Sequence, residues 1–179
     1  MKEPRLFAVA FAALISLPLT AQWRSGNDKI SDEPWRKGKK DFGAMLLLTP
    51  NAEKFYEEWS KPQTPNIATA ETTKRNKPLT AVVLFTGCKV SGGNCNIRVD
   101  FIVLKPDASN YGSQKDVAAW VNRPGAPKGV IQVSEASLRV VIESNDPAGK
   151  YIVKAIVRDL NAKVVLELKQ AFTVDELPA

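Results

Sequence analysis

Apolar and polar residues alternate over four stretches of the chain, which is the pattern of strands that bury one face. In residues 96–104, Ile97 and Val99 fall on one side and Arg98 falls on the other. We therefore predict four half-buried strands. The other three stretches with this alternation are residues 138–142, 151–158 and 164–174.

Two earlier stretches are apolar at nearly every position and are predicted to be buried strands. They are residues 42–49 and residues 79–85, the second of which is rich in β-branched side chains. Weaker strands are expected at residues 68–74, where basic residues would guard a sheet edge, and at residues 130–133. Residues 116–120 fit a helical turn or a short strand equally well.

One short helix is predicted directly after the first buried strand. Asn51 can cap its first turn, and Phe55 and Trp59 lie on one side. Pro62 ends it. Seven or eight short strands, a single helix and no regular alternation of strands with helices indicate a mainly β protein, an antiparallel β-sandwich.

Residues 1–21 have the three parts of a secretory signal peptide. Lys2 and Arg5 give a positive start. Residues 6–19 form a short apolar stretch, and small residues follow it up to Ala21. The stretch is short for a membrane span, although an uncleaved anchor is the alternative interpretation. We therefore predict a periplasmic or secreted protein that is soluble after cleavage and keeps roughly 155 residues, enough for one domain.

Residues 22–41 are polar and charged with almost no apolar periodicity, so we expect a flexible basic arm ahead of a single sandwich domain at residues 42–179. The arm holds a tryptophan beside a run of cations, and a second basic group follows the expected edge strand. The alternative is a solvated linker whose tryptophan caps the edge of the core. The candidate partner-binding residues are Trp35, Arg36, Lys37, Lys39, Lys40, Lys74, Arg75 and Lys77.

Cys88 and Cys95 are the only cysteines, and they enclose a glycine-rich turn. Zinc would need further cysteine or histidine ligands, and a thioredoxin-like redox pair would have a closer spacing. In an exported protein the two cysteines are expected to form a disulfide. We expect the flanking strands to be antiparallel hairpin partners, with Gly92 and Gly93 in the turn.

The hairpin interpretation leaves the register of residues 79–85 open. Val82 and Leu84 would share a face with the apolar side of the partner strand. Val83 and Phe85 are then left on the other face, although both are apolar. Either both faces of this strand are covered, or a bulge at the glycine before Cys88 shifts the register.

The chain contains no histidine, which removes Ser-His-Asp and Cys-His catalytic pairs and histidine ligands for zinc. Its carboxylates show no spacing that selects a catalytic pair, and no serine-x-x-lysine stretch is present. We therefore expect no catalysis, no cofactor and no metal. The formal net charge of +6 favours anionic partners such as envelope polysaccharide, lipid headgroups or acidic proteins, whereas nucleic acid is a poor partner for an exported chain.

Residues 138–174 resemble the final hairpin of immunoglobulin-like and fibronectin type III-like modules in secreted bacterial proteins, because an Asp-Pro-x-Gly-x-Tyr turn opens a strand. The whole chain is similar to uncharacterised exported proteins that add a Gly-Cys hairpin and a Pro-Asp turn. The resemblance implies an immunoglobulin-like sandwich with Tyr151 packed at its corner, and it implies almost nothing about function. The motif residues are Gly87-Cys88, Cys95, Pro106-Asp107 and residues 146–151.

By elimination, the sequence favours a non-catalytic binding or adaptor module that contacts another envelope or secreted protein. The alternative is binding of an anionic envelope glycan or lipid through a basic, tryptophan-containing surface, which moderate salt would weaken. An inhibitor of a basic enzyme such as lysozyme is disfavoured, because the positive charge of this chain would repel its target.

Overall fold

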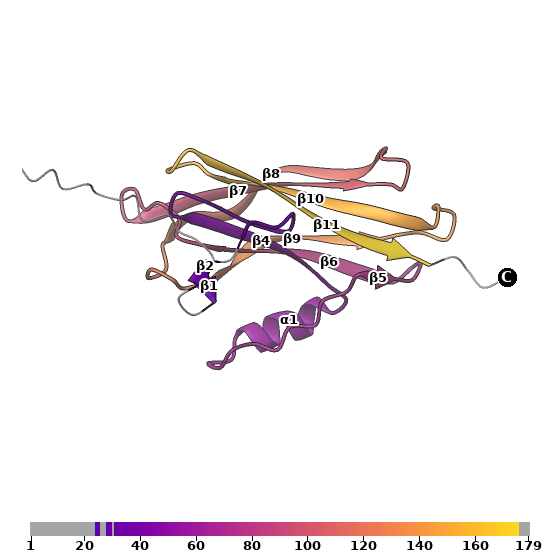
Figure 1. Cartoon of the computed structure of the whole chain (residues 1–179), viewed down its shortest axis with the longest axis horizontal. Coiled ribbons are helices and arrows are strands. Elements are labelled where there is room, and N and C mark those ends of the chain that lie inside the picture. Colours follow the sequence, from indigo (N-terminus) through magenta and orange to yellow (C-terminus); the bar gives the residue numbers. More distant parts are fainter. Residues whose placement is uncertain (1–23, 26–27, 30, 176–179) are drawn as a thin grey trace, which may run out of the picture.

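Two β-sheets pack face to face in the computed structural model, which describes residues 24–25, 28–29 and 31–175 (Figure 1). The first sheet contains, in spatial order, β3 (Arg36–Lys39), β4 (Phe42–Thr49), β6 (Pro78–Thr86) and β9 (Gln132–Val141). The second contains β5 (Thr72–Thr73), β11 (Val164–Val174), β10 (Gly149–Asp159), β7 (Asn94–Leu104) and β8 (Asn110–Pro124). A separate pair is formed by β1 (Arg24–Ser25) and β2 (Asp28–Lys29). The predicted signal peptide lies outside the described residues.

The strand order is that of an immunoglobulin-like sandwich, which confirms the predicted fold class. The consecutive strands β6 and β7 lie in different sheets, and so do β9 and β10. In the two main sheets all strand pairs are antiparallel except the short parallel contact of β5 with β11. The sheets hold five and four strands, more than the seven or eight expected, because β3 extends the first sheet into the region predicted to be an arm.

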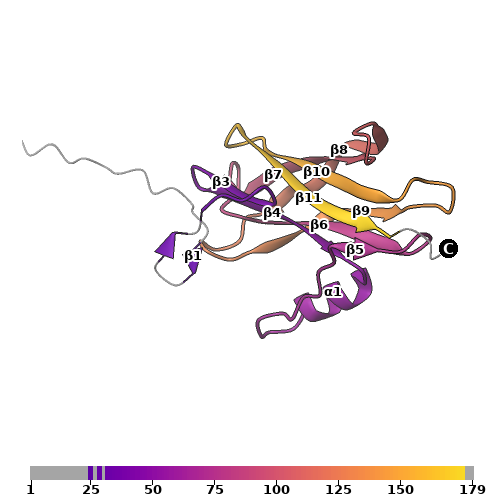
Figure 2. The same cartoon turned by 45° about the vertical axis from the view of Figure 1, so that its right-hand side comes forward.

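The core lies between the two sheets and is built largely from the predicted alternation. Nearly every second side chain of β7, β10 and β11 is buried, and these side chains share one core cluster with those of β4 and β6. Figure 2 shows the two sheets that enclose this core. The largest fully buried side chains include Tyr151, Phe101 and Phe172. Burial of a side chain of this size contributes about 1.5–3 kcal/mol relative to exposure, so the core is the main source of stability.

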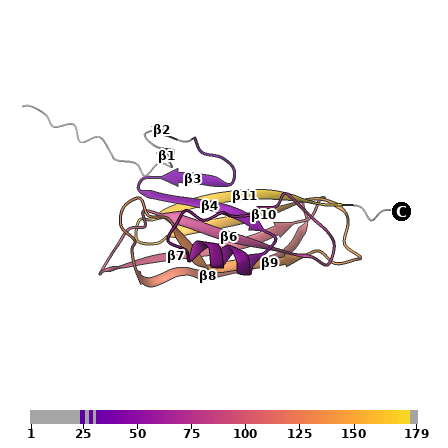
Figure 3. The same cartoon turned by 90° about the horizontal axis from the view of Figure 1, so that it is seen from below.

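β6 is buried on both faces, which is the first of the two alternatives left by its sequence. Val83 and Phe85 point into the core between the sheets. Val82 and Leu84 belong to a second apolar cluster with Phe55 of α1 (Ala52–Trp59). The helix therefore covers the outer face of the first sheet, where Figure 3 shows it in front of the strands.

The segment after β4 passes from the first sheet to the second. Asn51 caps α1 as predicted, since its Oδ1 accepts the N–H of Lys54 at 3.0 Å. After the helix the N–H of Ala70 donates to the carbonyl of Leu48 in β4 at 2.9 Å. The chain then reaches β5, where Thr72 pairs with Thr173 of β11 in parallel. This crossing brings Glu71 to the edge of β11, where its carbonyl accepts the N–H of Thr173.

The structure corrects two parts of the strand prediction and decides a third part that was left open. Residues 130–133 and 138–142 do not form two strands, because Gln132–Val141 is the single strand β9. The weak strand at residues 68–74 is reduced to the two residues of β5. Residues 116–120 lie inside the long strand β8, which alternation did not reveal because it is an edge strand with four register shifts and one fully buried residue.

Candidate functional site

Cys88 and Cys95 form the predicted disulfide, with their Cα atoms 6.0 Å apart. Between them, Ser91 and Asn94 pair through two backbone hydrogen bonds of 2.9 and 3.2 Å. The two glycines of this turn have φ angles of 59° and 86°, which glycine adopts without strain. The disulfide and the turn together close a compact loop.

The prediction that the strands flanking the disulfide are hairpin partners is wrong. β6 pairs with β4 and β9, whereas β7 pairs with β10 and β8. The disulfide loop is therefore the crossing from the first sheet to the second. The sequence misled because a glycine-rich turn between two apolar runs is also the signature of a hairpin.

Asp159 joins the disulfide loop to the turn between β10 and β11, a role that the sequence did not reveal. Asp159 is fully buried, and its two carboxylate oxygens accept the N–H groups of Lys89 at 2.7 Å and Ala162 at 3.0 Å. The Nδ2 of Asn161 donates to the carbonyls of Lys89 and Asn94 at 2.9 and 3.0 Å. These bonds hold two loops side by side at one end of the sandwich.

The prediction of a flexible basic arm at residues 22–41 is wrong for the part around Trp35. Arg36–Lys39 is the strand β3, and the carbonyl of Trp35 accepts the N–H of Leu46 in β4 at 2.8 Å. The carbonyl of Pro34 accepts the N–H of Lys169 in β11 at 2.7 Å. This segment therefore bridges the two sheets, and the folded domain begins before residue 42.

Trp35 borders two adjoining hollows where β11 approaches the first sheet. The larger has a volume of about 430 Å³ and the smaller about 250 Å³. Both are lined by Trp35, Glu71 and Gln170. The residues around the larger hollow are called the seam: Pro34, Trp35, Glu71, Lys150 and residues 169–173.

A short stretch of the outer edge of β11 lies in the seam between two pairings. On one side the N–H of Lys169 is bonded to Pro34, and on the other the N–H of Thr173 donates to the carbonyl of Glu71 at 2.8 Å. Alternate residues of a strand direct their backbone groups to the same edge, so Ala171 directs its N–H and C=O to this edge as well. Among the described strands, β5 pairs only with the two residues Thr173 and Val174, and Ala171 therefore lies outside both pairings.

Arg36 holds the ring of Trp35 at the seam. The Cζ of Arg36 lies 4.7 Å from the centre of that ring, a cation–π contact. Its Nη2 donates to the carbonyl of Ser31 at 3.3 Å. Its buried Nε has no hydrogen-bond partner within the described part of the chain. The sequence analysis had selected both residues as parts of a flexible arm, whereas Trp35 lines both hollows and Arg36 packs against its ring.

Lysines of β10 and β11 border the seam without anionic partners. Lys154 lies directly opposite Lys169, and Lys150 lies opposite Thr173. None of these three lysines forms an ion pair with a described residue. Because like charges directly opposite each other destabilise a sheet, a bound anion would stabilise this part of the outer face.

The structure does not bring together the two groups of basic residues selected from the sequence. Lys39 and Lys40 are exposed beside the end of β6, whereas Lys74 and Lys77 precede its start. β6 has nine residues. A strand of that length spans roughly 30 Å. The two groups therefore cannot form one binding surface.

Two of the selected basic residues are embedded in the fold. Arg75 donates from Nε and Nη2 to the carbonyl of Asp146 at 3.2 and 2.9 Å, which ties the turn before β6 to the turn before β10. Lys37 is half-buried in β3, where it pairs with Ala44. Of the original candidates, Trp35 and Arg36 are thus the ones that lie at or beside the seam.

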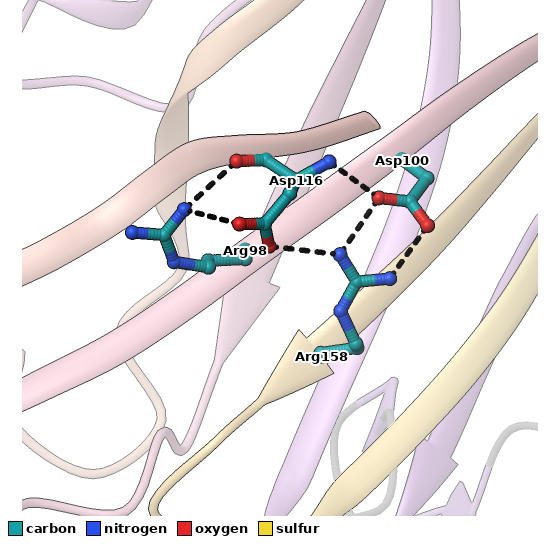
Figure 4. Close-up of polar contacts among 4 residues, drawn as sticks. All are labelled: Arg98, Asp100, Asp116 and Arg158. Atoms are coloured by element: carbon teal, nitrogen blue, oxygen red, sulfur yellow. Dashed lines mark hydrogen bonds and ion pairs between the residues drawn. The ribbon is translucent and has the colours of Figure 1, made fainter. Parts of the chain in front are cut away.

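Four charged side chains form a closed network on the outer face of the second sheet (Figure 4). Arg158 of β10 makes a bidentate pair with Asp100 of β7, with both N···O distances 2.7 Å. The Nη1 of Arg98 donates to Oδ2 and to the carbonyl of Asp116, each at 2.8 Å. The Nη2 of Arg158 also lies 3.3 Å from Asp116 Oδ1. Two cations and two anions therefore pair with one another.

This network stabilises an irregular part of β8. Asp116 has a φ angle of 55°, in the left-handed region that non-glycine residues adopt infrequently. Its N–H donates to Asp100 at 2.6 Å. Hydrogen bonds from Arg158 hold the pKa of the Asp100 carboxyl at about 2, so this group is ionised at neutral pH. The charges fix β8 to β7 and β10.

Tyr151 occupies the corner position expected from the Asp-Pro-x-Gly-x-Tyr turn. Its hydroxyl donates to the carbonyl of Pro147 at 2.8 Å, and its ring stacks on Phe172. Tyr111 of β8 packs edge-on against Tyr151, and its hydroxyl lies 2.7 Å from Asp146 Oδ2. Burial, together with the hydrogen bond to Asp146, raises the pKa of Tyr111 to about 12, so this hydroxyl stays protonated at neutral pH.

The part of the chain that the structure describes has neither a metal-binding cluster nor a membrane-spanning helix. No group of three or more histidine, cysteine, aspartate or glutamate side chains is arranged there to hold a metal ion. No helix there is long and apolar enough to cross a bilayer.

No protein-family model and no curated protein matches this chain. Among solved structures, the C-terminal domain of wzt aligns with 83% of this chain and 81% of its own, at 10% identity and a TM-score of 0.45. A Niemann-Pick type C2 protein from Japanese carpenter ant aligns with 73% of this chain and 89% of its own, at 10% identity and a TM-score of 0.40. Similarity at this level carries no argument about activity or ligand.

Two larger solved proteins also resemble this chain over part of their length. The Pseudomonas fluorescens DNA glycosylase AlkC aligns with 76% of this chain at 10% identity and a TM-score of 0.42. A family 123 glycoside hydrolase from Clostridium perfringens aligns with 76% at 12% identity and a TM-score of 0.42. The chain spans only 31% of the glycosylase and 28% of the hydrolase, and these similarities name no function for it.

Proposed function

We propose that this chain is a non-catalytic, exported binding module that contacts another envelope or secreted protein at the seam. The supporting observation is the backbone of Ala171, which faces a hollow beside Trp35 between two occupied stretches of the β11 edge. Export is supported by the start of the sequence and by the Cys88–Cys95 disulfide, because such bonds persist in oxidising compartments.

The partner would add a short extended segment to the edge of β11. Strand addition uses backbone hydrogen bonds for affinity and side-chain pockets for specificity. Pro34 and Glu71 occupy the flanking positions, so Ala171 supplies the N–H and C=O for pairing. With so few backbone bonds available, side chains must provide most of the affinity.

Trp35 and Arg36 are suited to supply that affinity. Tryptophan and arginine are enriched in protein interfaces, and residues of these types dominate binding energies. The cation–π contact keeps the indole ring at the hollow before a partner arrives. We expect Trp35→Ala to weaken partner binding by about 2 kcal/mol or more, which is roughly thirtyfold in affinity.

Replacing Ala171 by proline tests the strand addition directly. Proline removes the N–H that faces the hollow, while the neighbouring residues that bond to β10 keep theirs. Val165→Pro is the matched control, because Val165 directs its N–H to the same edge outside the seam. The measurement is crosslinking to the native partner through a photoreactive residue at position 170, with thermal melting as the folding check.

We expect the crosslink to be lost in Ala171→Pro and retained in Val165→Pro, with both variants folded. An Ala171→Pro protein that crosslinks as strongly as the unaltered chain would exclude strand addition. If Trp35→Ala also retained full crosslinking, the seam would not be the partner site.

Binding of an anionic envelope glycan at the same seam is the second candidate. It is favoured by Lys150, Lys154 and Lys169, which have no ion-pair partners among the described residues. Replacing Lys154 and Lys169 by glutamine should then weaken retention on a uronic-acid polysaccharide, and salt should weaken it further. The equal charge change at Lys74 and Lys77 is the control, and Ala171→Pro should leave glycan retention unchanged.

A further inference from the structure

A surface independent of the seam lies at the end of the sandwich that carries the disulfide. The connections β3–β4, β6–β7, β8–β9 and β10–β11 all meet there, at the left of Figure 1. Thr86 adds a bond between them, because its Oγ1 donates to the carbonyl of Val130 at 2.9 Å. We call this surface the disulfide end: residues 40–41, 87–93, 125–131 and 160–163.

Exposed aliphatic side chains gather at the disulfide end. Six large hydrophobic side chains are exposed in the described part of the chain, and those outside this end are Tyr56 on α1 and Val165 on β11. Single exposed apolar residues are ordinary on a protein surface, but a cluster of them marks an interaction site. The four at the disulfide end are Val90, Val130, Ile131 and Leu160.

The loops that carry these side chains are held by contacts to one another. The buried carboxylate of Asp159 and the disulfide fix the β6–β7 loop. Gly125 of the β8–β9 loop packs so closely that an added Cβ would lie 2.8 Å from Val90 Cγ2 and 3.1 Å from Cys95 Sγ. The aliphatic side chains therefore project from a preformed surface.

The loops that carry the aliphatic side chains also carry lysines. Four exposed lysines occupy these loops against one exposed acid, Asp41, and none of the four forms an ion pair with a described residue. A neutral apolar partner would desolvate these charges without compensation. A partner that combines an apolar interior with a negative surface would not. The lysines are Lys40, Lys89, Lys128 and Lys163.

We propose that the disulfide end docks on an anionic phospholipid membrane. The lysines bind the lipid phosphates, and the aliphatic side chains of Val90 and Leu160 enter the headgroup region below them. The bilayer offers both a negative surface and an apolar interior. Because the inserted side chains are few, attachment is reversible and depends on the surface charge of the membrane.

Co-sedimentation with vesicles tests this docking. Vesicles containing phosphatidylglycerol should bind the chain more strongly than vesicles of phosphatidylcholine alone, and added salt should remove the difference. Each lysine near an anionic surface changes the partition coefficient about fivefold, so replacing Lys89 and Lys163 by glutamine should lower it about thirtyfold. The same change at Lys74 and Lys77, outside the disulfide end, should have little effect.

Two valines provide a matched pair for the apolar contribution. Val90 is 50% exposed at the disulfide end, and Val165 is 51% exposed on β11. Val90→Asp should lower binding to phosphatidylglycerol vesicles at least tenfold, whereas Val165→Asp should not. All variants carry the same N-terminal residues, so any contribution of those residues to vesicle binding cancels when two variants are compared. Thermal melting verifies that each variant is folded.

Equal binding to both vesicle types, or an equal effect of the two valine substitutions, would overturn the proposal. A photoreactive residue placed at position 90 offers a second test. If it crosslinks the chain to another protein while the chain binds to neither vesicle type, the proposal is overturned and the disulfide end is assigned to a protein partner. Neither outcome bears on the seam, whose test uses different residues and a different readout.

Discussion

Replacement of Asp100 by asparagine should destabilise the domain more at neutral pH than in acid. The Asp100 carboxylate accepts two hydrogen bonds from Arg158 at 2.7 Å and one from the N–H of Asp116 at 2.6 Å. Asparagine keeps the shape but removes the charge and one acceptor. The side chains of Asp100 and Arg158 are 17% and 22% exposed, so water screens this pair less than an ordinary surface ion pair.

The size of the effect follows from the pKa of Asp100. The hydrogen bonds from Arg158 lower it from 3.8 to about 2. A shift of that size corresponds to about 2 kcal/mol of folding free energy. Because the folded-state pKa is the lower one, this contribution is present above the unfolded-state value of 3.8 and is lost as the pH falls toward 2. The destabilisation caused by Asp100→Asn should therefore shrink across that interval.

Urea unfolding at neutral pH and at steps through this interval measures the difference between the two proteins. Glu167→Gln is the control, because Glu167 lies on the same outer face and forms no ion pair with a described residue. A difference that stays constant down to about pH 2 would assign the loss to packing and refute the electrostatic reasoning. An Asp100→Asn protein as stable as the unaltered chain at neutral pH would refute it as well.

Two further predictions concern the disulfide and the helix. Replacing Cys88 and Cys95 by serine should lower the free energy of unfolding by about 1–3 kcal/mol and leave the fold intact, because the closed loop is short and Asp159 still holds it. Urea unfolding measures the loss and circular dichroism checks the fold. An unfolded variant would contradict the prediction. Phe55→Ala should lower the free energy of unfolding by about 3–5 kcal/mol in the same assay, because Phe55 fills the cluster between α1 and β6. Its neighbour Tyr56 is exposed, so Tyr56→Ala should cost little. Equal losses would show that α1 does not cover the sheet.

The parts of the fold that could be predicted from the sequence are those whose side chains alternate between core and solvent. β7, β10 and β11 bury nearly every second residue, so their pattern is strong. β3 was missed, and the part of β8 at residues 116–120 was left undecided between a helical turn and a short strand. Both are edge strands, which are held largely by backbone bonds and carry few buried side chains. Val82 and Leu84 could not be placed because their cover is α1, and no local pattern identifies which helix covers which sheet face.

The candidate site was predictable only in part for the same reason. Trp35 and Arg36 were selected by residue type, but the sequence could not show that they are built into a sheet. Glu71, Lys150 and Gln170 are ordinary polar residues, and they reach the seam through pairings between distant segments. The disulfide was predictable because its two cysteines are close in sequence, whereas the role of Asp159 in fixing their loop was not.

The parallel contact of β5 with the end of β11 has a consequence for the order in which the protein folds. Thr72 meets Thr173 only after a loop of about one hundred residues has closed, and contacts of such long range form slowly. Pro34 and Lys169 are separated even further along the chain. We therefore expect the seam to form late, after the core strands have assembled. A partner that binds there would distinguish a completely folded molecule from one in which the outer edge of β11 still lacks its contacts with Pro34 and Glu71.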